Sequence, residues 1–145
     1  MKITLINGPN LNLLGQREPN LYGSMTLSEI EDSVRRLGEE LGIEVTCFQS
    51  NIEGELVDCL QETDVKADGA ILNGGAYTHT SVAMRDAVAG IKVPVVEVHL
   101  TSPQAREEFR RTSLLADVAA GSISGFGSES YMLALLWFSR TTGNG

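Results

Sequence analysis

The chain has 145 residues, of which 42% are hydrophobic and 21% charged, a composition typical of one folded domain rather than of a disordered chain. Nineteen Asp and Glu residues against eleven Lys and Arg give a formal net charge of -8, which disfavours a nucleic-acid-binding protein because phosphate contacts need the opposite balance. The two cysteines are too few for a disulfide framework or a four-ligand zinc site, and the sequence shows neither a signal segment nor a long apolar run. We therefore expect a cytoplasmic protein that does not interact with membranes.

The predicted elements of the first half alternate between strands and helices. Residues 3–6 form an apolar run that predicts a strand. Residues 26–29 have the spacing of a capping box, which predicts the start of a helix over 27–41. Residues 43–47 then alternate as a second strand, and residues 50–53 predict a second capping box and a second helix.

The second half continues this alternation. Three further short apolar runs predict strands, at residues 70–72, 94–98 and 122–124. Helix caps are predicted at Thr78 or Thr80, at Ser102 with Pro103 in the first helical position, and at Ser128. The pattern predicts an α/β protein: a flavodoxin-like three-layer sandwich with a five-stranded parallel sheet of order 2-1-3-4-5. Residues 1–140 are expected to form a single catalytic domain and residues 141–145 a loose tail.

In an open parallel sheet, ligands bind beyond the carboxyl ends of the strands. Both histidines, His79 and His99, and several asparagines follow predicted strands, so they are expected at this edge. The three lysines, Lys2, Lys66 and Lys92, precede strands and are expected at the opposite edge. This placement argues against Schiff-base or pyridoxal chemistry, because such chemistry needs an amine in the pocket.

Signals for common cofactors are weak. The sequence has no Walker A motif, and residues 125–127 begin like a dinucleotide-binding loop but lack its third glycine. His79 and His99 are not arranged as an H-E-x-x-H helix, so they are weak evidence for a metal. We expect no cofactor and no metal, with a flavin- or nucleotide-binding protein of the same fold as an alternative.

Arg17 and Tyr22 lie in residues 7–24, a stretch with neither helical nor strand periodicity. Irregular segments of this length are often functional loops. A free tyrosine has a pKa of about 10, and a nearby arginine lowers it, so Tyr22 could remove a proton from a substrate. The alternative is that Arg17 pairs with Glu18 at the surface and that Tyr22 only packs its ring.

Glu97 and His99 are two positions apart in a predicted strand, so their side chains share one face. A carboxylate beside an imidazole stabilises the charged ring and fixes its tautomer, as a general acid requires. The alternative is a structural histidine.

Other polar residues at the same edge have both a functional and a structural interpretation. His79, near Asn73, could bind substrate hydroxyls or cap a helix. Free N–H groups at Thr101 and Ser102 could hold an anion at a helix start, or only cap it. Arg110 belongs to a charged run that would ordinarily face solvent, although its position does not require that orientation.

Six segments together resemble the type II 3-dehydroquinate dehydratases, in family order, between about residues 3 and 136. They are residues 6–23 (INGPNLNLLGQREP followed by Tyr22-Gly23), 49–55 (QSNIEGE), 77–87 (YTHTSVAMRDA), 97–100 (EVHL), 105–110 (AREEFR) and 125–127 (GFG). The resemblance implies a flavodoxin-like fold and a hydro-lyase of the shikimate pathway that needs no cofactor. The reaction implied is the reversible anti elimination of water from 3-dehydroquinate, which gives 3-dehydroshikimate.

The resemblance also implies a role for individual residues. Tyr22, as a tyrosinate whose pKa is lowered by Arg17, would remove a proton beside the ketone. Asn10 and the Pro9 backbone would hold a water that stabilises the enolate. His99, positioned by Glu97, would protonate the departing hydroxyl. Asn73, His79 and Arg110 would contact the substrate hydroxyls, and the backbone of Leu100 and Thr101 would hold the substrate carboxylate. Asp86 would act at a subunit boundary.

The family's assembly implies a dodecamer built as a tetramer of trimers. Two positions depart from the family pattern: Ile52, where a polar residue is common, and Ser102, where asparagine is usual. A role in quinate breakdown by the same reaction, and a non-catalytic module that binds a small anion, remain alternatives.

Overall fold

The sheet has the predicted order. In this computed structural model, which describes residues 1–16, 20 and 23–141, five parallel strands are arranged as β2-β1-β3-β4-β5. The strands are β1 (Lys2–Asn7), β2 (Glu44–Gln49), β3 (Gly69–Asn73), β4 (Val95–His99) and β5 (Gly121–Ser124). Cys47 and Cys59 are free thiols.

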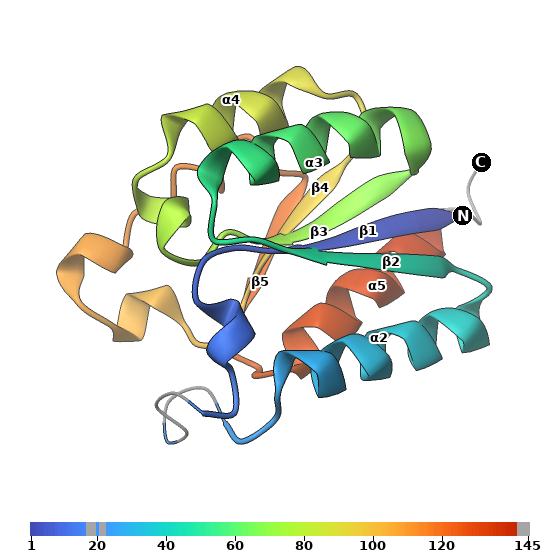
Figure 1. Ribbon diagram of the computed structural model, residues 1–145, viewed down its shortest axis with the longest axis horizontal. Coiled ribbons are helices and arrows are strands. Elements are labelled where there is room, and N and C mark those ends of the chain that lie inside the picture. Colours follow the sequence, from blue (N-terminus) through green and yellow to red (C-terminus); the bar gives the residue numbers. More distant parts are fainter. Residues whose placement is uncertain (17–19, 21–22, 142–145) are drawn as a thin grey trace.

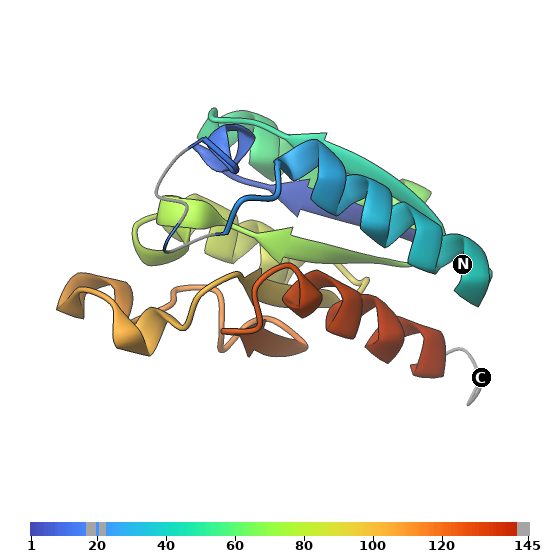
Figure 2. The ribbon, with the colours of Figure 1, turned by 90° about the horizontal axis from the view of Figure 1, so that it is seen from below.

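Helices cover both faces of the sheet, as Figures 1 and 2 show. Helices α2 (Leu27–Leu41) and α5 (Glu129–Thr141) cover one face, and α3 (Glu53–Lys66) and α4 (Val82–Gly90) cover the other. Thr141, expected in the tail, is the last residue of α5. The prediction of a flavodoxin-like three-layer sandwich is confirmed by this strand order and these two helix layers.

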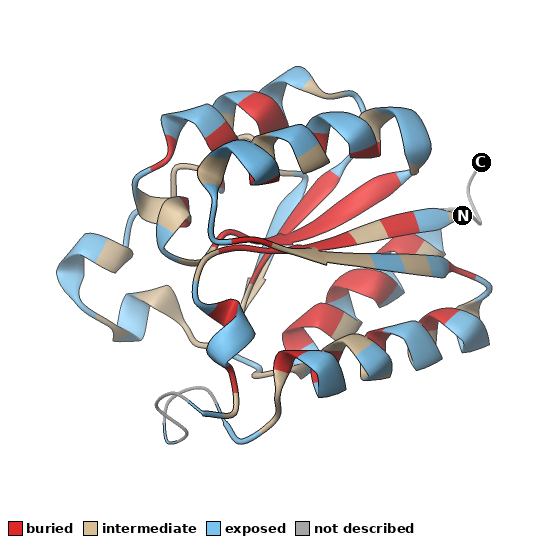
Figure 3. Ribbon diagram, viewed as in Figure 1, coloured by how far each residue is buried: buried red, intermediate tan, exposed pale blue. Residues whose placement is uncertain are grey.

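Two apolar clusters hold the layers together, one on each side of the sheet. Ile3, Leu5 and Ile71 belong to the cluster under α2 and α5, whereas Ile6 and Leu72 belong to the one under α3 and α4. This division follows from the alternation of side chains along a strand. The central strand β3 is buried along its whole length (Figure 3). Full burial on both faces explains why its sequence shows a continuous apolar run.

The helix starts only partly follow the predicted caps. Thr26 and Glu29 form the expected capping box at the start of α2, and Gly42 ends that helix with a left-handed φ of 72°. The second capping box is wrong, because α3 starts after Ile52, which provides no side-chain cap. The Ser50 hydroxyl instead accepts from the Ile52 N–H at 2.9 Å and donates to a Glu55 carboxylate oxygen at 2.8 Å.

The cap of α4 is also different from the prediction. Ser81 caps this helix by accepting from the Met84 N–H at 2.9 Å, whereas Thr78 and Thr80 were the expected caps. The reason is a 3-10 turn, η2 (Gly75–His79), which takes up the residues after β3 and delays the helix.

The short helix expected after Ser102 is not formed. The chain makes two separate 3-10 turns, η3 (Pro103–Ala105) and η4 (Glu108–Arg110), and Ser102 makes no side-chain cap. The turn after Ser102 is three residues long and has no significant helix dipole, so an anion there would be held by backbone N–H groups alone.

Candidate active site

A cavity of about 180 Å³ lies at the carboxyl ends of β1, β3 and β4. Its lining consists of Pro9, Asn10, Leu11, Leu14, Asn73, Gly75, Ala76, His79, His99, Leu100, Thr101, Pro103, Arg106 and Arg110. Seven of the eleven candidate residues are in that lining: Asn10, Asn73, His79, His99, Leu100, Thr101 and Arg110. Glu97 lies beside His99, and Asp86 is on the exposed side of α4, outside the lining. Arg17 and Tyr22 lie outside the described residues.

Glu97 and His99 are in contact at the end of β4. His99 Nε2 lies 3.1 Å from Glu97 Oε2, and the Glu97 side chain is only 2% exposed. The approach lacks the direction of a hydrogen bond, and Nε2 has no hydrogen-bond partner within the described residues. His99 therefore contacts the buried carboxylate through Nε2 and also lines the cavity.

Two serines hold the Glu97 carboxylate from distant parts of the chain. The Ser122 hydroxyl donates to Oε1 at 2.6 Å, and the Ser113 hydroxyl donates to Oε2. Burial by itself raises the pKa of Glu97, but the contact with His99 and the two serine hydrogen bonds outweigh burial and lower it. Glu97 is therefore ionised at neutral pH, and its carboxylate lies against the His99 ring.

His79 lies opposite this pair. Its ring is nearly parallel to that of His99, with the ring centroids 6.5 Å apart. His79 Nδ1 is 2.8 Å from the carbonyl oxygen of Thr112. Because that oxygen can only accept, Nδ1 carries a proton, and a neutral ring has an acceptor at Nε2. The site thus offers one imidazole paired with a carboxylate and another with a fixed tautomer.

Asn10 has a strained backbone, with φ at 67°, and is the only non-glycine with positive φ in the described part of the chain. Its N–H donates to Asn51 Oδ1 at 2.9 Å, and Gln49 Nε2 donates to the Gly8 carbonyl at 3.1 Å. Gln49 at the end of β2 and Asn51 beyond it therefore support the loop after β1 and do not line the cavity.

Two arginines supply the positive charge of the cavity. Arg106 and Arg110 both line it, and Arg110 Nε lies 2.6 Å from Glu107 Oε2. Arg111, their neighbour in the charged run, is exposed. The charged run in the sequence indicated that Arg106 faces solvent, and it left the orientation of the Arg110 side chain undecided. Arg106 was missed because the two 3-10 turns, and not one helix, decide which side chains face inward.

The lining favours acid-base chemistry on a small polar anion. It combines two imidazoles, two guanidinium groups and two amides, and none of the three lysines belongs to it. Among residues 1–16, 20 and 23–141, no three His, Cys, Asp or Glu side chains are grouped so as to hold a metal ion. In the same residues, no helix is both long and apolar enough to cross a membrane.

Comparison with known proteins relates this site to a family. The sequence model described as Dehydroquinase class II matches residues 1–139. The chain belongs to this family. A protein named 3-dehydroquinate dehydratase from Prochlorococcus marinus is 58% identical over 135 residues, which are 93% of this chain and 91% of that protein. Another of that name from Bacillus licheniformis is 52% identical over 139 residues, with 96% of each chain covered.

Solved structures support the same assignment. The type II dehydroquinase of Butyrivibrio crossotus superposes with a TM-score of 0.93 at 42% identity, over 94% of this chain and 96% of that one. Within this class II dehydroquinase fold, the two departures from the family pattern lie outside the cavity lining. Ile52 is 60% exposed at the start of α3, and Ser102 borders a neighbouring hollow beside Gly125 and Phe126.

Proposed function

We propose that this class II dehydroquinase is a 3-dehydroquinate dehydratase. It would eliminate water from 3-dehydroquinate to give 3-dehydroshikimate, reversibly and with anti geometry. The observation that carries the proposal is the Glu97–His99 pair facing a cavity that also contains two arginines, His79 and two asparagines. This arrangement provides a general acid beside an anion-binding lining, and similar proteins are named 3-dehydroquinate dehydratase.

The reaction starts with removal of a proton from the carbon next to the ketone. Tyr22, deprotonated beside Arg17, is the proposed base. The electrons move into an enolate, which a water held near Asn10 and the Pro9 carbonyl would stabilise. Both of these residues line the cavity, and the strained loop that bears them is held by Asn51 and Gln49.

The second half of the reaction expels the hydroxyl. The enolate re-forms the ketone, the carbon–oxygen bond breaks, and His99 gives its proton to the oxygen, which leaves as water. The ionised Glu97 stabilises His99 in its charged form before this transfer. Solvent then returns a proton to His99 and accepts one from Tyr22, which restores the enzyme.

The remaining candidates would bind the substrate. Asn73, His79 and Arg110 would contact its hydroxyls, and the backbone of Leu100 and Thr101 would hold its carboxylate. All five line the cavity, and Arg106 adds a second positive charge. Asp86 would act at a subunit boundary, in agreement with its exposed position on α4.

We also propose that residues 1–140 act as one catalytic domain in a cytoplasmic dodecamer, a tetramer of trimers, that needs no metal or organic cofactor. Light scattering on the purified protein tests the assembly. A mass of one, two or three chains would contradict the dodecamer.

A direct assay tests the activity. Purified protein is mixed with 3-dehydroquinate, and the ultraviolet absorbance of the conjugated product is followed before and after borohydride treatment. We expect product in both cases, because no lysine lines the cavity to form an imine. The His99→Ala and Tyr22→Phe variants should lose about 10²–10⁴-fold in kcat, as is typical for the loss of a general acid or base.

Each other outcome has a definite meaning. A folded protein that binds 3-dehydroquinate without consuming it would be a binding module, and the proposal would be wrong. Loss of activity after borohydride would indicate an imine route. Variants with normal turnover would refute the roles of His99 and Tyr22 while leaving the activity intact.

A further inference from the structure

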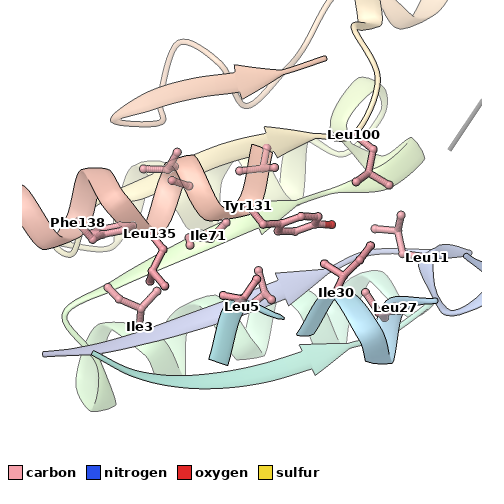
Figure 4. Packing of buried hydrophobic residues seen from close by; sticks show 14 of the residues in the cluster. Ile3, Leu5, Leu11, Leu27, Ile30, Ile71, Leu100, Tyr131, Leu135 and Phe138 are labelled. Atoms are coloured by element: carbon pink, nitrogen blue, oxygen red, sulfur yellow. The ribbon is translucent and has the colours of Figure 1, made fainter. Parts of the chain in front are cut away.

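Three buried polar side chains meet directly beneath the cavity, where α5 crosses the ends of β1 and β3. Asn7 and Tyr131 are 0% exposed, and Asn73 is 4% exposed. The Tyr131 hydroxyl donates to Asn7 Oδ1 at 2.5 Å and accepts from Asn73 Nδ2 at 2.9 Å. In Figure 4 this hydroxyl points away from the helix toward the end of the cluster that holds Leu11 and Leu100, two residues of the cavity lining.

The direction of these hydrogen bonds is determined by their partners. The Gly75 N–H can only donate, so it directs Asn73 Oδ1 toward itself and Nδ2 toward Tyr131; the Tyr131 oxygen accepts from Nδ2, and its single proton goes to Asn7. Burial raises the pKa of Tyr131, and the phenol therefore keeps this proton throughout the neutral range. At the other end of the Asn73 amide, Oδ1 accepts from the Gly75 N–H at 3.1 Å.

Both partners of Asn73 thus require the same orientation of its amide. A flipped amide would place an N–H against the N–H of Gly75, a donor that cannot turn, and it would have a partner in Tyr131 only if the Tyr131 proton turned away from Asn7. Because the site is buried, neither group could turn to water instead. In the observed orientation, one Nδ2 hydrogen is used by Tyr131, and the second remains for a ligand in the cavity that Asn73 lines.

We propose that Tyr131 is a positioning residue of the active site, which fixes the Asn73 amide so that it donates to an acceptor oxygen of the substrate. This inference rests on the proposed function, since Asn73 is there a contact to a substrate hydroxyl. Tyr131 does not line the cavity, so it acts only through Asn73. A residue with a purely structural role would instead affect folding without a specific dependence on Asn73.

The test is a double-mutant cycle between Tyr131→Phe and Asn73→Ala. Tyr131→Phe keeps the buried ring and removes only the hydroxyl. We expect kcat/KM for 3-dehydroquinate to fall by about tenfold in the wild-type background, as for the loss of one hydrogen bond. In the Asn73→Ala background the same substitution should change kcat/KM by less than about twofold, because the group on which it acts is gone.

The matched control is Thr63→Val. Thr63 is 2% exposed in α3, away from the cavity, and its hydroxyl donates to the Cys59 carbonyl at 2.7 Å. This variant also removes one buried hydroxyl, so its melting temperature should fall as that of Tyr131→Phe does. Its kcat/KM should stay within about twofold of the wild type, since a moderate loss of stability leaves the folded fraction nearly unchanged.

A spectroscopic measurement keeps the result independent of turnover. In the wild type, the Asn73 side-chain amide should give two well-separated and slowly exchanging proton resonances, and Tyr131→Phe should bring them together. The inference is wrong if Tyr131→Phe keeps the wild-type kcat/KM, if its effect persists in the Asn73→Ala background, or if the Asn73 resonances do not change. An inactive wild-type protein would contradict the proposed function, and the Asn73 resonances would then decide the role of Tyr131.

Discussion

His79 is hydrogen-bonded through Nδ1 to the carbonyl oxygen of Thr112, 2.8 Å away, and the next residue along the chain, Ser113, donates its hydroxyl to Glu97. Two consecutive residues of one irregular segment thus act on both imidazoles of the cavity. The Ser113 hydroxyl also accepts from the N–H groups of Leu115 and Ala116, at 3.1 Å each, which fixes its own position. The backbone of this segment therefore sets the tautomer of one ring, and its side chain sets the orientation of the carboxylate beside the other.

Ser113→Ala should consequently reduce turnover more than substrate affinity. The Glu97 carboxylate loses one donor and can turn away from His99, so we expect kcat to fall by about tenfold, while KM changes little. Stability should fall by about 1–3 kcal/mol, because a partly buried acceptor and two backbone donors lose a partner. Steady-state kinetics and urea unfolding measure these effects. Ser33→Ala on α2, which loses a hydrogen bond to the Glu29 carbonyl and one from Arg36 far from Glu97, is the control, and an equal effect on kcat would contradict the assignment.

Glu97 makes stability depend on acid pH. Its folded-state pKa is lower than the ordinary value for glutamate of about 4.3, so the unfolded chain binds the proton more tightly. The stability from this residue is complete above that ordinary pKa and is lost as the pH falls through the lower, folded-state pKa. Urea midpoints of the wild type and of Glu97→Gln between pH 2 and pH 7 should converge toward acid pH. The exposed Glu40→Gln variant is the control, and a difference that is independent of pH would exclude this linkage.

Substrate affinity should weaken with salt, despite the net charge of -8. Arg106 and Arg110 line the cavity with partly exposed guanidinium groups, and their attraction for an anion is screened over about 10 Å at 0.1 M salt. We expect KM to rise between low salt and 0.5 M salt, and Arg106→Ala or Arg110→Ala should each flatten this dependence. Arg111→Ala, an exposed position in the same charged run, should leave the salt response unchanged. A flat response in the wild type would mean that neutral hydrogen bonds dominate binding.

Two glycines should respond to alanine in opposite directions. A Cβ on Gly8 would lie 2.5 Å from the carbonyl oxygen of Gly74, where the loops after β1 and β3 touch. Gly8→Ala must separate these backbones, and we expect a loss of about 1–3 kcal/mol of stability together with weaker substrate binding. Gly54, in α3, has no atom within 4 Å of its added Cβ, so Gly54→Ala should stabilise by about 0.5–1 kcal/mol. Thermal melting of both variants distinguishes these outcomes, and equal shifts would mean that the contact at Gly8 relaxes freely.

Much of the fold could be predicted from the sequence, because the relevant signals are local. Short apolar runs that alternate with periodic helical segments predict the sheet and its helix layers. Alternation within one strand was enough to place Glu97 and His99 on the same face, and polar residues after strands predicted the edge at which the cavity lies. The start of α4 was not predicted, since the choice among Thr78, Thr80 and Ser81 depends on how tightly the chain turns after β3.

What the sequence by itself determined is therefore the set of strands, the helices that cover the sheet, the strand order, and the edge that holds the polar residues. Only the tertiary structure decided which groups, distant in the sequence, hydrogen-bond to the polar residues of the site. Ser113 and Ser122 reach Glu97 across 16 and 25 residues, and Tyr131 reaches Asn73 across 58. No periodicity connects such positions, because each contact depends on how a helix or an irregular segment packs against the end of a strand. The reason these contacts form is that a buried polar group must find a partner within the packed protein, and packing alone determines which partner is near.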